Sequence, residues 1–380
     1  MIYKILVDEN IPFAAEAFSQ FGQVELIPGR DIVNDSLNSV DILIVRSITR
    51  VDEGLLKGSS VRFVGTTTIG EDHIDKEYLK RNNIGFANAP GCNADSVAVY
   101  LFAGLFKIAA AKGFNLQDKS IGIIGNGNTG SRAARIADAA GMKKYINDPP
   151  LQRKTGDAFY VSYAKSLEAD ILTYHVPLNM DGIDKTYHML SKSELNKFNE
   201  SKIILNASRG KVISNDDLKD FLQDNHNTVI LDVWENEPEI DVDLLNLVYK
   251  GTPHIAGYSY EGKVNGTIMI FKSLARFLRI DKEWKPDLTG IDKNVINYPE
   301  GKLEESIDMI ISGIYDMNAD DNKLRKVNDL EAGVKGRYFD QLRKNYPVRR
   351  EFTNYTIRIS KKLQKEIRVL KALRFNIKEI

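Results

Sequence analysis

The chain has 380 residues, 43% of them hydrophobic, so its length predicts two or three domains with enough apolar material for packed cores. Lys plus Arg equals Asp plus Glu at 52 each, which excludes the chain-wide positive field that nucleic-acid or acidic-membrane binding would use. The single cysteine, Cys92, cannot form an internal disulfide, and neither a signal-peptide pattern nor an 18-residue apolar run is visible, so we expect a cytoplasmic protein that binds no nucleic acid and no membrane.

In residues 1–93, short β-branched runs alternate with helical patterns. The strand-like runs are "YKILVDEN", "DILIVRS", "VRFVGTT" and "NIGFANAP", and helices are expected around residues 12–21 and 74–81. This alternation predicts a parallel, doubly wound sheet. A long apolar helix, "NADSVAVYLFAGLFKIAAAKG", then leads away from it.

A second alternating series begins at "KSIGIIGNGNTGSRAARIADAAG" and continues through "TVILDVWENEP". Six strand-like runs predict a second doubly wound sheet. Within this series, Ser191 and Glu194 fit a capping box at a helix start. The helix over about 264–278 is expected to pack back on the first lobe, so we predict two Rossmann-like α/β lobes with a cleft between them.

The pattern changes after Trp284 to a turn-rich stretch, then to amphipathic helices with one clear strand, "YTIRIS". We expect a small C-terminal α+β domain here. The predicted domains are therefore a discontinuous substrate-binding lobe of residues 1–93 and 259–284, a nucleotide-binding lobe of residues 94–258, and the C-terminal domain of residues 285–380.

A glycine loop lies in the second lobe. Gly125, Gly127 and Gly130 follow the strand "SIGII" with the spacing G-x-G-x-x-G and open the helix "SRAARIADAAG". Asn128 and Thr129, between the last two glycines, are expected to bind the cofactor with them. Such glycines let the backbone approach a pyrophosphate, whose charge faces the unpaired N–H groups at a helix start. Asp148, at the end of the next strand, would bind the ribose hydroxyls and disfavour a 2′-phosphate, so NAD is predicted rather than NADP. The alternatives are a tight turn without a ligand, and a solvated carboxylate at position 148.

Three polar residues follow later strands of the same lobe: Arg209 in "NASRG", Glu237 in "WENEP" and His254 in "TPHIAG". The carboxyl ends of parallel strands share one edge of the sheet, where open α/β sheets bind ligands. Taken singly, each could be a structural or surface residue, and Glu237 or Glu235, two residues earlier, could simply face solvent. Together, behind a dinucleotide loop, they predict a 2-hydroxy acid dehydrogenase site without a metal.

In that mechanism the histidine takes the hydroxyl proton and a carboxylate holds the imidazole, while the arginine clamps the substrate carboxylate and the cofactor carries the redox chemistry. His175, in "TYHVPL", ends a strand of the same lobe. We expect it to line the nicotinamide side of the cofactor site.

The chain resembles the D-isomer-specific 2-hydroxy acid dehydrogenases over essentially its whole length. The likeness runs through "ILVDENIP", "VRSITRV", "FVGTTTIGEDHID", "APGCNADSVA", "LDVWENEPE", "HIAGYSYEGK" and "LRKNYPVRREF". It is strongest to the branch whose phosphorylated substrate leads to pyridoxal 5′-phosphate. Within this likeness the C-terminal domain is a homodimerisation domain.

The resemblance also implies individual roles. It makes Arg209 and Glu237 active-site residues and His254 the proton donor in the reductive direction. The substrate pocket would contain Ser47, Thr68 and Tyr258, whereas NAD would contact Asp148, Val176, Ala207, Ser208, Arg209, Asp232 and Gly257. For Val176 and Ser208 main-chain contacts suffice.

A substrate with a phosphate opposite its carboxylate requires a second basic group. Arg46 and Arg50 in "VRSITR" are our first choices, Lys263 is a third, and a further hypothesis takes Arg349 or Arg350 into the site of a partner subunit. Two other functions remain open. One is a dehydrogenase for 3-phosphoglycerate or glycerate, although the tail does not read as the regulatory domain often appended to phosphoglycerate dehydrogenases. The other is an NADH-sensing binding protein of the same fold.

Overall fold

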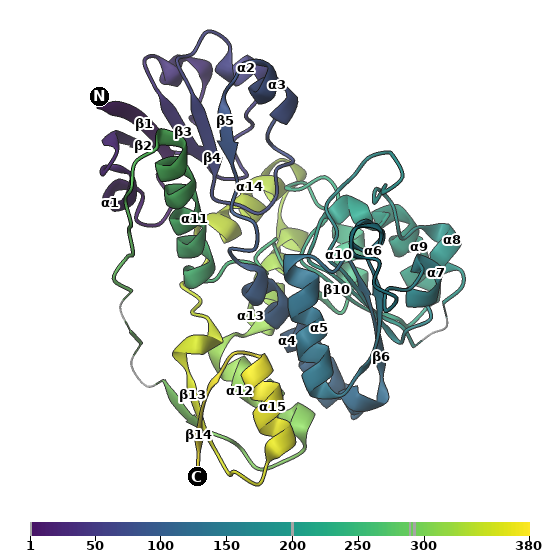
Figure 1. Ribbon diagram of the computed structural model, residues 1–380. Coiled ribbons are helices and arrows are strands. Elements are labelled where there is room, and N and C mark those ends of the chain that lie inside the picture. Colours follow the sequence, from purple (N-terminus) through teal and green to yellow (C-terminus); the bar gives the residue numbers. More distant parts are fainter. Residues whose placement is uncertain (1, 199–200, 289, 292–293) are drawn as a thin grey trace. The chain divides into compact units, whose positions relative to one another are not determined.

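The computed structural model describes residues 2–198, 201–288, 290–291 and 294–380 (Figure 1). The chain divides into two compact units. The first contains residues 1–93 and 259–290, and the second contains residues 94–258 and 291–380. Each is an α/β structure, and all strand pairs in the described part of the chain are parallel.

The first unit is built on a five-stranded sheet in the order β2-β1-β3-β4-β5. Its strands are β1 (Tyr3–Asp8), β2 (Gly22–Ile27), β3 (Ile42–Val45), β4 (Phe63–Thr66) and β5 (Gly85–Ala87). The helices are α1 (Ala14–Phe18), α2 (Glu53–Leu56), α3 (Lys76–Arg81) and α11 (Tyr260–Leu278), with the 3₁₀ turn η1 (Asn34–Leu37). The helix expected over 12–21 is thus confined to α1.

Both faces of this sheet are covered, which explains the unbroken apolar run of β3. Ile42 and Ile44 pack on one face with Phe271 of α11, whereas Leu43 and Val45 pack on the other. Side chains alternate between faces along a strand, so only a doubly covered sheet requires four apolar residues in a row. Helix α11 therefore returns the chain to the first unit, as predicted.

The second unit contains a six-stranded sheet in the order β11-β10-β9-β8-β6-β7. Its strands are β6 (Ser120–Ile124), β7 (Lys143–Asn147), β8 (Ile171–Tyr174), β9 (Ile203–Asn206), β10 (Thr228–Leu231) and β11 (Lys250–Gly251). Because the chain runs outward from β6 first to β7 and then to β8, the order reverses beside β6. Ligands of open α/β sheets bind at such a reversal.

Among the described residues, α4 (Ala94–Lys112) and η2 (Leu116–Asp118) precede this sheet, and the other helices and 3₁₀ turns of this part of the chain connect its strands. These are α5 (Asn128–Ala140), α6 (Pro149–Thr155), α7 (Tyr163–Ser166), α8 (Lys192–Leu195), α9 (Asn215–Asp224), α10 (Val242–Leu247) and η3 (Gly210–Val212). The capping box of Ser191 and Glu194 is present at the start of α8. Helix α5 begins at Asn128, earlier than the "SRAARIADAAG" stretch suggested.

Helix α4 forms part of the core of the second unit. By length and composition it could cross a membrane, but 67% of its apolar stretch is buried inside the structure. Leu101, Leu105 and other residues of α4 share one hydrophobic cluster with residues of α5. Its apolar composition is that of a core helix.

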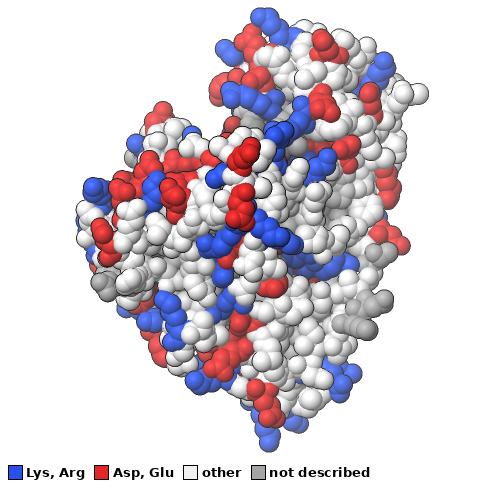
Figure 2. All heavy atoms as spheres, turned by 180° about the vertical axis from the view of Figure 1, so that it is seen from behind, with Lys and Arg blue, Asp and Glu red and all other residues white. Residues whose placement is uncertain are grey.

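The C-terminal region adds a three-stranded sheet in the order β12-β13-β14. Its elements are β12 (Val295–Asn297), α12 (Leu303–Ile314), α13 (Met317–Arg325), η4 (Lys326–Asp329), α14 (Ala332–Lys344), η5 (Phe352–Asn354), β13 (Thr356–Ile359), α15 (Gln364–Ala372) and β14 (Asn376–Glu379). Ile307 and Ile311 of α12 join the cluster that contains α4. This region therefore shares a core with the dinucleotide-type sheet. On the face shown in Figure 2, basic and acidic side chains are interspersed.

Candidate active site

The glycine loop of the second unit links β6 to α5, and each glycine has its own steric reason. Gly125 has a φ of 90°, which disfavours residues with a side chain. A Cβ at Gly130 would lie 1.9 Å from the carbonyl oxygen of Gly125, so helix and loop approach too closely for any other residue. By contrast, a Cβ at Gly127 would have no neighbour within 4 Å. The loop is therefore compact beneath and open above, at the start of α5.

Asp148 supports this loop as well as flanking it. It follows β7, and its Oδ2 accepts a hydrogen bond of 2.7 Å from the backbone N–H of Asn126. Its Oδ1 caps α6 through the N–H of Leu151 at 2.9 Å. Asn126 Oδ1 is buried and has no hydrogen-bond partner among the described residues. An open backbone surface, a helix start and a carboxylate at the next strand end fit the pyrophosphate and ribose of a dinucleotide.

His175 and Val176 lie beside the glycine loop. The backbone N–H of His175 donates to the carbonyl of Ile124 at 2.7 Å, and the side chain of Val176 lies 3.0 Å from where a Cβ on Gly125 would be. Although His175 keeps some exposed surface, enclosure of its ring lowers its pKa to about 3. It is therefore a neutral imidazole at physiological pH.

Residues 207–209 form a turn after β9 that Asn206 organises. The Asn206 side chain accepts hydrogen bonds from the N–H of Ser208 at 3.0 Å and from its hydroxyl at 2.8 Å, and donates to the carbonyl of Arg209 at 2.9 Å. Sequence reasoning missed this residue. The signal was an asparagine at the end of an otherwise apolar strand, a place where side-chain amides often fix a turn.

This turn is packed against the loop that carries Glu237. A Cβ at Gly210 would lie 2.0 Å from the carbonyl oxygen of Trp234, so only glycine allows the two backbones to meet. The structure thus brings the Arg209 turn next to the "WENEP" segment, as expected for strand ends that share one edge.

His254 and Glu237 form a hydrogen-bonded pair. His254 Nδ1 lies 2.7 Å from Glu237 Oε2, and the side chains remain 34% and 19% exposed. Glu237 Oε1 accepts a bond of 2.8 Å from the N–H of Trp234. Burial alone would raise the pKa of Glu237, but His254, Arg343 and this backbone bond together hold it below its usual value. Glu237 is therefore a carboxylate that orients the imidazole and leaves Nε2 for chemistry.

The neighbouring carboxylate, Glu235, bonds to other residues than His254. Its Oε1 accepts bonds from the N–H of Asn215 at 2.8 Å and lies 3.0 Å from Nε2 of His188. Glu235 thus ties the loop to the start of α9, and it is Glu237 that contacts His254.

Asp232 holds the histidine loop from beneath. It is fully buried, and its carboxylate accepts bonds from the hydroxyl of Thr252 at 2.6 Å and from the N–H groups of Ile255 at 2.7 Å and Ala256 at 2.9 Å. Burial raises its pKa despite the opposing effects of His254 and these bonds. Its contact with NAD stays a prediction, and its internal role went unrecognised in the sequence because it depends on residues 20 or more positions away.

The predicted substrate residues of the first unit follow β3 and β4. Ser47 is exposed, and the Thr68 hydroxyl lies 2.8 Å from that of Thr66. Arg46 pairs with the buried Asp8 at 2.9 Å, and Arg50, 84% exposed, pairs with Asp52 at 2.7 Å. Both arginines therefore have carboxylate partners, and their contact with substrate stays a prediction. Lys263 lies in the first turn of α11.

The C-terminal region contacts the loop that follows His254. The rings of Tyr258 and Tyr346 meet edge to face, with centroids 5.8 Å apart, and the Arg349 guanidinium donates to the carbonyls of Ile255 and Ala256. Arg350 donates to Asn354 at 2.9 Å. Arg349 thus binds backbone carbonyls of its own chain, and the entry of Arg349 or Arg350 into a partner's site stays a prediction.

Comparison with known proteins identifies the family of this chain. Residues 101–256 match the NAD-binding domain of the D-isomer specific 2-hydroxyacid dehydrogenases, and residues 294–373 match a domain of unknown function. The chain is 43% identical to the erythronate-4-phosphate dehydrogenase of Proteus mirabilis over 93% of this chain and 94% of that protein. The chain belongs to the erythronate-4-phosphate dehydrogenase family. That of Klebsiella pneumoniae is 41% identical over 94% of each chain.

Solved structures support the fold of this family member. The NAD-bound 3-phosphoglycerate dehydrogenase of Entamoeba histolytica superposes with a TM-score of 0.62 at 24% identity, covering 75% of this chain and all of its own. The D-lactate dehydrogenase of Aquifex aeolicus, with NAD and lactic acid, superposes with a TM-score of 0.60 at 23% identity. That match covers 73% of this chain and 95% of the other. Each match leaves about a quarter of this chain uncovered. The predicted Rossmann-like fold and the NAD cofactor are confirmed.

Proposed function

We propose that this chain catalyses the NAD-dependent oxidation of 4-phospho-D-erythronate to 2-oxo-3-hydroxy-4-phosphobutanoate, a step in pyridoxal 5′-phosphate biosynthesis. The proposal is supported by relatives of that name that match nearly the whole length of the chain. The observation that carries the chemistry is the 2.7 Å contact between His254 Nδ1 and Glu237 Oε2.

His254 acts as the general base in the direction of oxidation. With Nδ1–H donated to Glu237, Nε2 carries a lone pair and accepts the proton of the C2 hydroxyl as the C2 carbonyl forms. The resulting imidazolium is stabilised by the adjacent carboxylate. In the reverse direction the same nitrogen returns the proton to the carbonyl oxygen.

Arg209 binds the substrate carboxylate. A guanidinium presents two parallel N–H donors to a carboxylate, so it fixes both the position and the orientation of C2. The Asn206 bonds hold the backbone from which this side chain extends.

NAD bound at the glycine loop, with Asp148 at its ribose, supplies the acceptor for the hydride that leaves C2. The phosphates of NAD would lie against the glycine loop, at Gly125, Gly127, Asn128, Thr129 and Gly130. The nicotinamide end would lie near His175, Val176, residues 207–209, Asp232 and Gly257. In the substrate pocket we place Ser47, Thr68 and Tyr258.

We also propose the three-domain division given by the sequence, a homodimer formed through the C-terminal domain, and a cytoplasmic location. Sedimentation of the full chain and of a chain ending at residue 284 tests the dimer. A full-length monomer, or a dimer that survives the truncation, would contradict this part of the proposal.

A substrate screen tests the function. Nicotinamide absorbance is followed with 4-phosphoerythronate, 3-phosphoglycerate, glycerate and lactate in parallel. The highest kcat/KM is expected with 4-phosphoerythronate, and a preference for another acid would favour a related dehydrogenase. No turnover with any of the four would favour the NADH-sensing alternative.

A further inference from the structure

In the second unit, helix α14 of the C-terminal region packs against the loop that carries Glu237. A Cβ at Gly336 in α14 would lie 2.1 Å from the carboxylate of Glu239 and 3.2 Å from Pro238, the two residues after Glu237. Phe339, also in α14, is fully buried in the cluster that contains Trp234. Helix α14 is therefore packed directly on the segment that positions Glu237.

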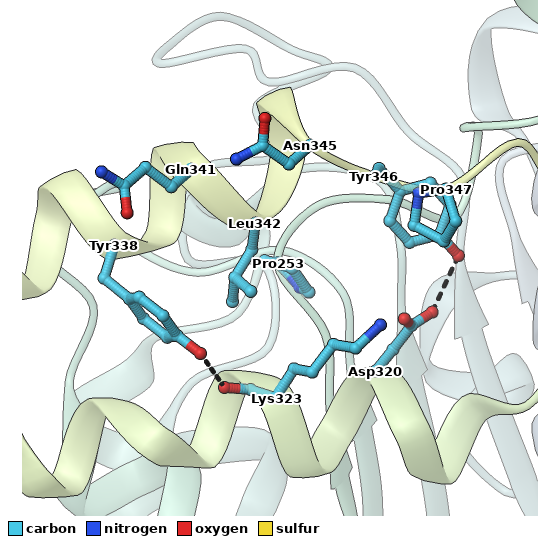
Figure 3. Close-up of a pocket in the computed structure, with 9 residues that line it drawn as sticks. All are labelled: Pro253, Asp320, Lys323, Tyr338, Gln341, Leu342, Asn345, Tyr346 and Pro347. Atoms are coloured by element: carbon cyan, nitrogen blue, oxygen red, sulfur yellow. Dashed lines mark hydrogen bonds between the residues drawn. The ribbon is translucent and has the colours of Figure 1, made fainter.

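The C-terminal region also lies next to Pro253, the residue before His254. A pocket of about 250 Å³ between α13 and α14 is lined by Pro253, the residue before His254, and by Leu342 and Tyr346 (Figure 3). Tyr338 donates to the carbonyl of Lys323 at 2.8 Å, and Tyr346 donates to Asp320 at 2.8 Å. These bonds fix α14 to α13, so side chains from the last turn of α14 have defined positions.

Arg343 lies in that last turn. Its guanidinium carbon is 5.8 Å from the centre of the Tyr258 ring, and its Nε is buried without a hydrogen-bond partner among the described residues. Its charge also acts on Glu237, favouring the carboxylate. An unused N–H of a buried guanidinium costs free energy unless a ligand accepts from it.

The proposed substrate supplies such an acceptor. Its phosphate lies two carbons beyond the C2 atom that His254 serves, and Tyr258 follows His254 in the same loop. A dianionic phosphate beside Glu237 would be repelled unless a cation lay between or near them. A guanidinium is well suited to bind phosphate oxygens with parallel donors.

We propose that Arg343 binds the terminal phosphate of the substrate and so makes the C-terminal region part of the substrate site of its own chain. This inference rests on the proposed function for the identity of the ligand. It assigns a role to a residue of the segment that matches a domain of unknown function.

The other basic groups considered for the phosphate already have partners. Arg46 and Arg50 pair with Asp8 and Asp52, and one terminal nitrogen of Arg349 is bonded to the carbonyls of Ile255 and Ala256. Nη1 of Arg349 is also buried without a hydrogen-bond partner among the described residues, but that guanidinium lies over the rings of Tyr315 and Tyr346. Arg343 differs because its guanidinium lies beside Tyr258 and its charge acts on Glu237.

The test compares Arg343→Gln with Arg337→Gln, an exposed arginine of the same helix. Steady-state rates give KM for 4-phosphoerythronate and the inhibition constants of inorganic phosphate and of D-erythronate, which lacks the phosphate. In Arg343→Gln we expect KM and the phosphate constant to rise by about 10- to 100-fold, as for loss of a charged hydrogen bond. The D-erythronate constant should change by less than about 2-fold, and Arg337→Gln should match the parent enzyme.

Equal losses for phosphate and D-erythronate would show a positioning role instead and overturn the proposal, as would no loss at all. If Arg343→Gln fails to fold, Arg343→Lys decides by the same criterion, since an ammonium keeps the charge but not the fork. If the parent enzyme does not oxidise 4-phosphoerythronate, the proposed function fails. The anion site is then tested separately by whether inorganic phosphate raises Tm in the parent and in Arg337→Gln but not in Arg343→Gln.

Discussion

Nδ1 of His254 lies 2.7 Å from Oε2 of Glu237 while the backbone N–H of the same histidine donates to the carbonyl of Asp232 at 2.7 Å. His254 is thus held at its ring by the side chain of Glu237 and at its backbone by the carbonyl of Asp232. Glu237 determines its orientation, whereas Asp232 determines the position of the loop. This double anchoring leaves Nε2 as the ring nitrogen that does not contact Glu237.

Replacing His254 removes the proposed base. We expect His254→Ala to lower kcat by at least about 10²-fold, the usual scale for a positioned acid or base. The measurement is kcat by nicotinamide absorbance at saturating substrate. His226→Ala, which removes an exposed histidine, serves as the control and should keep normal turnover. Near-normal kcat in His254→Ala would refute the assignment.

Arg209 is expected to depend on its planar shape as well as its charge. Arg209→Lys should reduce kcat/KM by about 10-fold or more, because an ammonium cannot bind a carboxylate through two parallel bonds. Arg337→Lys, at an exposed arginine of α14, provides a matched substitution and should leave kcat/KM close to that of the parent enzyme. Equal effects of the two substitutions would indicate that Arg209 does not hold the substrate.

Asp148 is expected to determine the choice of cofactor. Asp148→Ser should narrow the preference for NAD over NADP, because the carboxylate that repels a 2′-phosphate is lost. The ratio of kcat/KM for the two cofactors is the measurement. Asp148 also accepts a hydrogen bond from the N–H of Asn126, so its loss could disturb the glycine loop. The Tm of the variant is therefore measured, to distinguish a disturbed loop from a changed cofactor contact. Unchanged discrimination in a folded variant would remove Asp148 from the cofactor site.

The neutral His175 should make stability depend on pH. Burial lowers its pKa from 6.5 to about 3, so below pH 6.5 the unfolded chain binds a proton that the folded chain does not. The free energy of unfolding should therefore fall as pH decreases from 6.5 toward 3, by up to about 1.4 kcal/mol per pH unit for one proton. His175→Asn should remove this contribution, whereas His226→Asn should leave it. Denaturant unfolding from about pH 8 to about pH 5 measures the free energy of unfolding of each protein. If that free energy varied with pH in the same way in the parent and in His175→Asn, the prediction would be wrong.

Local patterns in the sequence were sufficient to predict the alternating strands and helices, the glycine loop, and Arg209, Glu237 and His254 at strand ends. Each depends on residues close together in the chain: strand faces alternate every second residue, and the three glycines lie within six positions. Only the tertiary structure showed the contact of Glu237 with His254, the hydrogen bonds of Asp232 to the histidine loop, and the position of Arg343 beside Tyr258. Those relationships join segments up to about 85 positions apart, and charge or burial at one position depends on which distant side chain packs against it.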